Sequence, residues 1–357
     1  MPIRVGIIGA SFARAAYLPA LHHVDDAEVV ALASARLDSA RIAAEPFGVP
    51  NVYDDWRAML SAHEFDLVCI ATPTDTHAEM TLAALEAGAH VLCEKPTAMD
   101  AAEAAAMRDK ATELGRIGVL GHELRFNPNR QKIAELVHAG AIGEIRHVHI
   151  SNISAGWSDP AARPKNDWWS LAERGGGRLG ANGSHQTDLL RWWFGEVRAV
   201  TGRAVTMIPN RVDRETGEAW TATADDLVHM ILELERAALA DVFLSGVARH
   251  TLGNHTQIFG SEGTILLSND DETLWLGAPG SEFEDVTVPD PNADLPRVNK
   301  GIWNVSYVAF MRELCSAIQE GRPVAHAATF EDGLKNQQVL DAVKRATVER
   351  CWIDPHA

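Results

Sequence analysis

Cysteine is scarce in this chain and never closely spaced. The four cysteines stand at positions 69, 93, 315 and 351, so no CxxC pair suggests a zinc site or a redox disulfide. No apolar run approaches the roughly 20 residues that a membrane helix needs. A first strand that begins at Ile3 leaves no room for the charged and apolar segments of a secretory signal. We therefore expect reduced thiols, no membrane span and a cytoplasmic protein.

The chain also lacks any run of Lys or Arg. Its net charge is −17, which repels nucleic acid and anionic membrane surfaces on average. We expect neither as a partner. The 15 histidines include the pairs His22/His23 and His147/His149, but these lack the convergent carboxylates or thiolates of a metal site. No metal is expected.

The first part of the chain alternates between strand-like and helix-like patterns. Strands are predicted at residues 3–9, 28–33, 66–71, in the run that leads into Lys95, and at 117–121, and helices at 12–23, 38–44, 75–87 and 100–114. Asp38 and Asp100 are candidate N-caps for two of these helices. This alternation predicts an α/β fold, with a doubly wound parallel sheet over roughly the first 120 residues.

After Pro128 the pattern changes. A helix at 130–138 is followed by β-rich runs at 144–153, 197–207, 227–234, 238–247, 256–260 and 264–267, which favour a large, mostly antiparallel sheet in an α+β domain. Residues 279–300 are expected to be irregular, and helices are predicted at 303–320 and 330–349. Because 357 residues exceed what one core usually supports, we expect two domains, 1–123 and 124–357, whose last helices can pack back on the first domain.

The turn after the first strand is a candidate phosphate-binding turn. Only Gly9 of a GxGxxG pattern is present, followed by Ser11, Phe12 and Ala13. A glycine lets the backbone approach a pyrophosphate at the helix N-terminus. An ordinary strand-to-helix turn would look the same locally, but the place of this turn in the opening βα unit favours a dinucleotide.

The end of the second strand carries no acid that could bind an adenosine ribose. The chain reads Ser34-Ala35-Arg36, and Asp38 is already assigned to helix capping. An acid here usually marks NAD, whereas an arginine accommodates the 2′-phosphate of NADP. We therefore prefer NADP over NAD, with Ser34 and Arg36 on the phosphate. The alternative is a solvated arginine of no consequence.

A buried strand ends abruptly in Glu94-Lys95-Pro96, at the kind of edge where open α/β sheets bind ligands. With this motif included, the chain resembles the Gfo/Idh/MocA oxidoreductases over nearly its whole length. The resemblance rests on residues 5–10, 71–73 with His77, 93–96, 125–128, 140–143, 175–177, 183–185 with Asp188, and 321–323. Their order and spacing together are specific.

The resemblance implies an N-terminal Rossmann domain that binds NAD(P) and a C-terminal domain built on an open sheet. It implies cofactor contacts from Thr72, Pro73, His77, Glu94, Lys95 and Pro96. It also implies that Lys95 touches the nicotinamide ribose and the substrate hydroxyl, that His185 is the acid or base, and that Arg125 lies with the substrate. The implied activity is hydride transfer at a secondary alcohol or ketone of a sugar, cyclitol or related polyol.

The residue types suit that chemistry. Oxidation of an alcohol releases a proton, which an imidazole with a reference pKa near ~6.5 can accept. A lysine ammonium can stabilise the developing alkoxide. Lys95 could instead be a surface lysine, and His185 a satisfied core histidine. Asp188, one helical turn after His185, could orient the imidazole or cap the first turn.

One position departs from the family pattern. Many members carry an aspartate four residues before the histidine, where this chain has Ala181, followed by Asn182. An amide can hydrogen-bond a substrate hydroxyl but cannot take its proton. Two functions therefore remain open: an enzyme in which His185 works without that aspartate, and a sensor of the same fold that binds NAD(P) and sugar without turnover.

A pair of tryptophans, Trp168 and Trp169, follows Asn166 and Asp167. Aromatic faces beside amide and carboxylate groups suit a sugar ring, and Trp157 could belong to the same wall. Burial in the core is equally plausible for each tryptophan. Because the family's open sheet usually pairs face to face, the resemblance also implies a homodimer or homotetramer.

Overall fold

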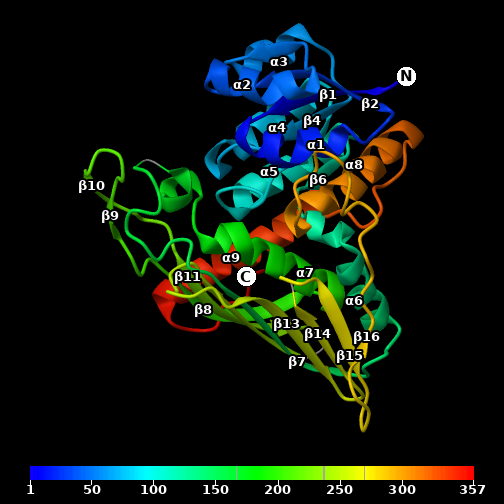
Figure 1. Ribbon diagram of the computed structural model, residues 1–357, viewed down its shortest axis with the longest axis vertical. Coiled ribbons are helices and arrows are strands. Elements are labelled where there is room, and N and C mark those ends of the chain that lie inside the picture. Colours follow the sequence, from blue (N-terminus) through cyan, green and yellow to red (C-terminus); the bar gives the residue numbers. More distant parts are fainter. Residues whose placement is uncertain (166, 236–237, 269) are drawn as a thin grey trace. The chain divides into compact units, whose positions relative to one another are not determined.

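The computed structural model describes residues 1–165, 167–235, 238–268 and 270–357. The chain divides into two compact units. The first consists of Met1–Ala98, Ala102–Asn127 and Pro289–Leu334, and the second of Met99–Ala101, Pro128–Val288 and Lys335–Ala357. Figure 1 labels the elements of both units.

The first unit is built on a six-stranded parallel sheet with the order β3-β2-β1-β4-β5-β6. Its strands are β1 (Ile3–Ile8), β2 (Ala27–Ala33), β3 (Asn51–Tyr53), β4 (Leu67–Ile70), β5 (His90–Cys93) and β6 (Gly118–Leu120). Every residue of β4 is buried, as expected for a strand covered on both faces. The predicted doubly wound sheet is confirmed. The short edge strand β3 was missed because three residues show no periodicity.

Helices connect these strands. They are α1 (Leu18–Leu21), preceded by a π-helical turn (Ala13–Tyr17), and then α2 (Leu37–Ala44), α3 (Trp56–Ala62), α4 (His77–Glu86) and α5 (Ala101–Glu113). The prediction that Asp38 caps α2 was wrong. Arg36 is the N-cap residue, and Asp38 lies exposed in the first turn, 3.5 Å from Arg41. Helix α3 was not predicted, although Asp55 caps it by accepting the Arg57 N–H at 2.9 Å.

A helix from late in the chain completes the core of this unit. Helix α8 (Ile302–Glu320) buries Val305, Val308, Met311 and Cys315, which recur at helical spacing on one face. These side chains join a cluster that includes Ile7 of β1 and Leu18 of α1. Residues placed by sequence in a second domain therefore lie in the first compact unit. The boundary between residues 123 and 124 stays a prediction.

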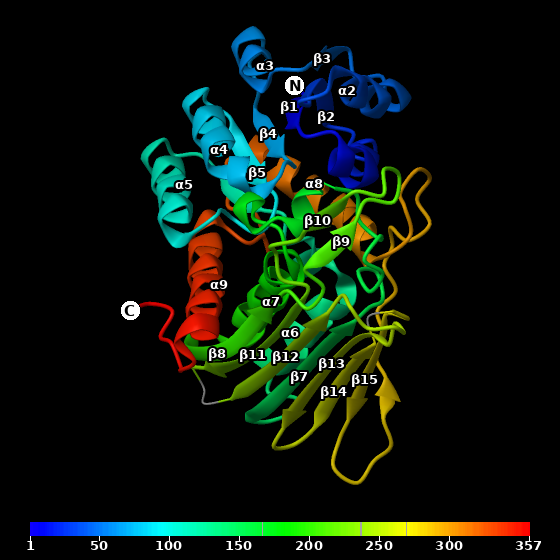
Figure 2. The ribbon, with the colours of Figure 1, turned by 90° about the vertical axis from the view of Figure 1, so that its left-hand side faces the viewer.

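The second unit contains a mixed sheet of eight strands in the order β16-β15-β14-β13-β7-β12-β11-β8. These are β7 (Ile145–Ile153), β8 (Val197–Val205), β11 (Leu227–Leu234), β12 (Leu239–Ser245), β13 (Gly253–Gly260), β14 (Thr264–Ser268), β15 (Thr273–Gly277) and β16 (Glu284–Asp285). Among the described residues, β7 and β12 are the only strands of this sheet that pair in parallel, so the prediction of a mostly antiparallel sheet is confirmed. Figure 2 shows these strands side by side.

One face of this sheet is buried. Val148, Ile150, Val242 and Ile258 alternate with more exposed residues, and helices α6 (Pro128–His138) and α7 (Ser184–Phe194) lie along the buried side (Figure 1). The last helix, α9 (Phe330–Glu349), matches its predicted range, and Thr347 accepts the Ala204 N–H of β8 at 2.9 Å.

A small two-stranded sheet is formed by β9 (Asn210–Val212) and β10 (Ala219–Thr221). All four cysteines are free thiols, three of them buried. Within the described ranges, no helix combines the length and the apolar character needed to cross a membrane.

Candidate functional site

The turns after β1, β2, β4 and β5 lie at one edge of the first unit's sheet, because these strands are parallel and neighbouring. Gly9 ends β1 with a φ of +107°. A Cβ at this position would lie 2.2 Å from the carbonyl oxygen of Ala71, which follows β4. The Gly9 N–H also donates to Ala33 at the end of β2, at 2.8 Å. Glycine is therefore required here both by its backbone angle and by the close approach of the next turn.

The predicted phosphate-binding residues begin the helical segment after Gly9. Ser11 is exposed, Phe12 is half-buried and Ala13 is buried. The ring of Phe12 packs edge-on against Tyr17 and Tyr307, with centroid separations of 5.5 and 5.7 Å. Phe12 thus anchors the turn to the interior, while Ser11 is at the surface.

The end of β2 is open to solvent. Ser34 is half-buried and donates its backbone N–H to Tyr53 at 3.0 Å, and Arg36 is exposed and precedes α2. The Asp38 carboxylate lies 3.5 Å from the Arg41 guanidinium. Arg36 is thus the first charged residue after β2, and Asp38 follows it.

The turn after β4 holds Thr72, Pro73 and His77 together. His77 is 1% exposed, and its ring lies between two carbonyl oxygens, those of Thr72 and Pro96, each 3.0 Å from a ring nitrogen. Burial lowers the pKa of His77. The side chain therefore links the turn after β4 to the Lys95-Pro96 turn after β5. A cofactor contact of His77 stays a prediction.

Glu94 follows β5 directly and is 6% exposed. Its Oε1 accepts hydrogen bonds from the phenols of Tyr17 at 2.7 Å and Tyr307 at 2.5 Å, while its Oε2 lies 3.9 Å from Nζ of Lys95. Burial, and next the Glu94 charge, raise the pKa of both phenols. Neither tyrosine was predicted as a site residue, and the one sequence signal that points to them is that tyrosine is scarce, with three in the chain.

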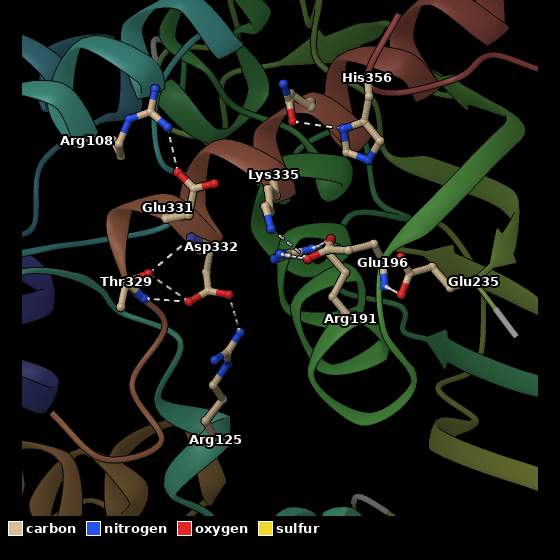
Figure 3. A network of polar contacts seen from close by, with 11 residues as sticks. Arg108, Arg125, Arg191, Glu196, Glu235, Thr329, Glu331, Asp332, Lys335 and His356 are labelled. Atoms are coloured by element: carbon tan, nitrogen blue, oxygen red, sulfur yellow. Dashed lines mark hydrogen bonds and ion pairs between the residues drawn. The ribbon is translucent and has the colours of Figure 1, made fainter. Parts of the chain in front are cut away.

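Arg125 lies in the same unit and is 5% exposed. It forms an ion pair with Asp332 at 3.5 Å, and Asp332 forms a reciprocal capping pair with Thr329 at the start of α9 (Figure 3). Arg125 thus has a structural role in fixing that helix start. Its predicted contact with substrate is untested.

In the second unit, a glycine-rich turn leads to the predicted catalytic histidine. A Cβ on Gly177 would lie 2.3 Å from Oδ1 of Asp225, and Asp225 Oδ2 accepts the Leu179 N–H at 2.8 Å. Burial raises the pKa of Asp225 to about 6. Asp225, which was not predicted as a site residue either, thus fixes this turn through the Leu179 N–H.

His185 is the second residue of α7 and is 2% exposed, and Asp188, one turn later, is 1% exposed. Asn182 and Ala181 are half-buried in the π-helical segment Leu179–Gly183 that precedes α7. Asn182, His185 and Asp188 therefore lie on one continuous helical segment. An orienting role of Asp188 stays a prediction.

The far end of α7 is anchored by charge. Arg191 contacts both carboxylate oxygens of Glu196, at 2.8 and 3.0 Å, and Lys335 reaches the same carboxylate at 3.1 Å (Figure 3). These ionic contacts lower the pKa of Glu196 even though burial opposes them. The C-terminal end of the helix that carries His185 is therefore fixed by two ion pairs to one carboxylate.

The three tryptophans proposed for a sugar site lie in two different environments. Trp168 and Trp169 are half-buried and stack on each other, with ring centroids 4.3 Å apart. Trp157 is 9% exposed, and its ring lies 5.5 to 6.0 Å from the guanidinium groups of Arg163, Arg178 and Arg211. Trp157 is thus a core residue, and the structure describes no contact between it and the stacked pair. Asn166 lies outside the described residues.

The strand order and the convergent turns define a dinucleotide-binding fold of the Rossmann type. Family models agree. Residues 3–122 match the oxidoreductase family with an NAD-binding Rossmann fold, and residues 130–266 match the GFO/IDH/MocA C-terminal domain. The chain belongs to the Gfo/Idh/MocA family of oxidoreductases.

Individual relatives support this assignment. Inositol 2-dehydrogenase of Rhizobium meliloti is 27% identical over 351 residues, which cover 98% of each protein. D-apiose dehydrogenase of Paraburkholderia graminis is 30% identical over 272 residues, which cover 74% of this chain and 67% of that protein. A structure of levoglucosan dehydrogenase in complex with NADH and L-sorbose is 26% identical and superposes with a TM-score of 0.87 over 99% of each chain. The family resemblance and the fold class predicted from the sequence are confirmed.

Proposed function

We propose that this protein is an NAD(P)-dependent dehydrogenase that transfers a hydride between a secondary alcohol of a sugar or cyclitol and the nicotinamide. The observation that carries the proposal is the convergence of the Gly9 turn and the Glu94-Lys95 turn at one sheet edge, with Lys95 placed beside a buried carboxylate. Named relatives that oxidise inositol and apiose support the substrate class.

In this proposal the bound nicotinamide supplies the hydride acceptor. Lys95 stabilises the alkoxide that develops on the substrate oxygen, since an ammonium in a water-poor site interacts strongly with developing negative charge. His185 accepts the hydroxyl proton, which an imidazole can do near neutral pH. Because Ala181 cannot share that proton, the whole of the general-base role falls to His185.

The substrate end of the proposal rests on the stacked pair Trp168 and Trp169. Half-buried indole faces bind the apolar face of a sugar ring, and Asn182 can donate to or accept from a hydroxyl. Arg125 completes the substrate set carried over from the resemblance.

For the cofactor, we propose NADP in preference to NAD. Support comes from the exposed Arg36 beside the half-buried Ser34, and from the engagement of Asp38 with Arg41 rather than with the end of β2. A guanidinium pairs with a phosphate dianion through charge-assisted hydrogen bonds, whereas a ribose diol offers it only neutral hydroxyl groups. The cofactor set also includes Ser11, Phe12, Ala13, Thr72 and Pro73.

The first test is calorimetric titration of the protein with NADP⁺ and NAD⁺. Arg36→Ala should weaken NADP⁺ binding about tenfold, the loss expected for one charge-assisted contact, and should leave NAD⁺ binding unchanged. Arg108→Ala is the control, because Arg108 lies on α5, pairs with Asp109 and Glu331, and belongs to neither the turn after β2 nor α2, so it should change neither affinity. If wild type and Arg36→Ala bind NADP⁺ with the same affinity, the NADP assignment is rejected.

The second test is turnover with a panel of inositols, glycosides and anhydrosugars, followed by the absorbance of the reduced nicotinamide. Lys95→Ala and His185→Ala should each lower kcat by about 10²- to 10⁴-fold. Dinucleotide binding without turnover of any member of the panel would favour the sensor alternative instead.

A further inference from the structure

The Glu94 carboxylate is surrounded by the interior of the first unit. It is 6% exposed, and the backbone closes one side of it, since a Cβ on Gly121 would lie 2.6 Å from Glu94 Oε1 and 2.7 Å from the Tyr307 hydroxyl. A buried carboxylate is costly unless each oxygen is paired. An apolar or amide side chain would fill this site at lower cost, so the charge itself calls for an explanation.

The two carboxylate oxygens have different partners. Oε1 accepts the phenol hydrogens of Tyr17 at 2.7 Å and Tyr307 at 2.5 Å. Oε2 faces Lys95, with the backbone N–H at 3.4 Å and Nζ at 3.9 Å. The phenols therefore hold one oxygen so that the other is presented to the lysine. Two of the three tyrosines of the chain serve this one carboxylate.

The aromatic rings leave the phenols little freedom. Tyr17 and Tyr307 meet edge-on at 5.2 Å, Phe12 packs edge-on against both, and Phe310 stacks on Tyr307 at 6.1 Å. Phe12 belongs to the turn after β1 and Tyr307 to α8. The phosphate-binding turn, a helix from late in the chain and the Glu94-Lys95 turn thus share one packed cluster.

We propose that Tyr17 and Tyr307 are positioning residues for Lys95, acting through Glu94. The inference rests on the proposed catalytic role of Lys95. Each phenol withdraws negative charge from Glu94 and fixes the direction of its second oxygen. Lys95 is then attracted strongly enough to be held in place, and weakly enough for its ammonium to remain available to a substrate oxygen.

The inference predicts opposite effects from two kinds of substitution. Tyr307→Phe and Tyr17→Phe each remove one donor and keep the ring, so Glu94 should bind the ammonium more tightly and Lys95 should lose its proton at higher pH. Glu94→Gln keeps an acceptor for the phenols but removes the charge, so Lys95 should lose its proton at lower pH. Tyr53→Phe is the matched control, because Tyr53 bonds His63 at 2.8 Å and not Glu94.

Two measurements on the intact protein test this. The first is an NMR titration of ¹³C-lysine, which is tractable because the chain has seven lysines, and the Lys95 resonance is assigned by its loss in Lys95→Arg. The second is the pH profile of kcat and KM. Tyr307→Phe should lower kcat about tenfold, the scale of one hydrogen bond to a charged group, while KM for the dinucleotide stays within about twofold.

The inference is supported if Tyr→Phe at 17 or 307 moves the Lys95 titration upward, Glu94→Gln moves it downward and Tyr53→Phe does not move it. It is overturned if the phenol variants lose thermal stability but keep the wild-type Lys95 titration and kcat profile, since the phenols would then only satisfy a buried carboxylate. If one tyrosine variant fails to fold, the other carries the test. A wild type that turns over no sugar would reject the proposed function, and the NMR titration would still decide this inference.

Discussion

Nδ1 of His77 lies 3.0 Å from the carbonyl oxygen of Pro96, across the gap between the turns after β4 and β5. Nε2 of the same ring lies 3.0 Å from the carbonyl oxygen of Thr72. A neutral imidazole carries one N–H, so it can donate to only one of these acceptors, whereas the imidazolium could donate to both. Burial nevertheless lowers the pKa of His77, so the neutral ring is favoured in the folded protein.

His77 should therefore destabilise the fold in mild acid. Its folded pKa is below the unfolded value, so the unfolded chain binds the extra proton first, and stability present above about pH 6.5 is lost as the pH falls. His77→Gln should remove this part of the pH dependence and cost about 1–3 kcal/mol at pH 7.5 through lost packing and hydrogen bonding. Urea unfolding of both proteins between pH 5 and pH 8 measures the difference, and parallel curves would contradict the expectation.

Asp225 should contribute a pH dependence of stability opposite to that of His77. Its pKa is raised to about 6 by burial, so the folded state holds a proton that the unfolded state has released. The stability it contributes is present below about pH 4 and is lost as the pH rises through about 6. Asp225→Asn, which still accepts the Leu179 N–H, should be at least as stable as wild type at pH 7.5 and should show less loss of stability between pH 4 and pH 7.

Asp213 provides the matched control in the same unit. Hydrogen bonds from backbone N–H groups, first that of Lys165, lower the pKa of Asp213 to about 2. Its contribution is present above about pH 4 and is lost as the pH falls towards 2. Asp213→Asn should therefore lower the free energy of unfolding at neutral pH. If Asp225→Asn and Asp213→Asn change this free energy in the same direction, the protonation of these two carboxyl groups does not explain either effect.

Gly9→Ala should abolish dinucleotide binding. The new Cβ would lie 2.2 Å from the Ala71 carbonyl at a φ of +107°, so the turns after β1 and β4 must separate. Gly48→Ala is the control, because Gly48 also has a positive φ of +67° but no atom lies within 4 Å of the added Cβ. We expect the control to cost about 1 kcal/mol and to bind normally, and Gly9→Ala to cost more than about 2 kcal/mol. Calorimetry and urea unfolding measure both effects.

The exposed face of the eight-stranded sheet should carry the contacts of a homo-oligomer. Leu239 and Trp275 are exposed there, Phe243 is half-buried, and Asp241 bridges His149 and His229 at 2.9 and 2.6 Å. Large apolar side chains exposed on a sheet face are typical of a protein interface. Light scattering should show a dimer or tetramer for wild type and a smaller species for Phe243→Glu.

Val348→Glu is the control for that substitution. Val348 is 80% exposed and belongs to α9 rather than to a strand of the sheet, so the same charge there should leave the oligomer intact. A monomeric wild type would remove the basis of the expectation.

The sequence alone determined the class of fold and the turns of that fold on which most of the predicted site residues lie. Apolar runs ending at Gly9, Ala33, Ala71 and Cys93 predicted the parallel strands, because a strand buried on both faces must be apolar throughout. Parallel neighbouring strands then place their following turns at one edge, so the predicted cofactor residues lie together. Local periodicity also predicted α9 at its observed range.

Tertiary structure decided what depends on contacts between residues distant in sequence. Tyr17 and Tyr307 both bond Glu94 although 290 positions separate them, and no local pattern near either tyrosine predicts that partner. Asp225 and Gly177 meet in the same way. The assignment of Asp38 as an N-cap was wrong because the N-cap is the last residue before the backbone becomes helical. That residue is Arg36, which is extended, and α2 begins at Leu37. The periodicity of apolar residues predicts which face of a helix or strand is buried. Which distant residues that face contacts is decided only by the tertiary packing.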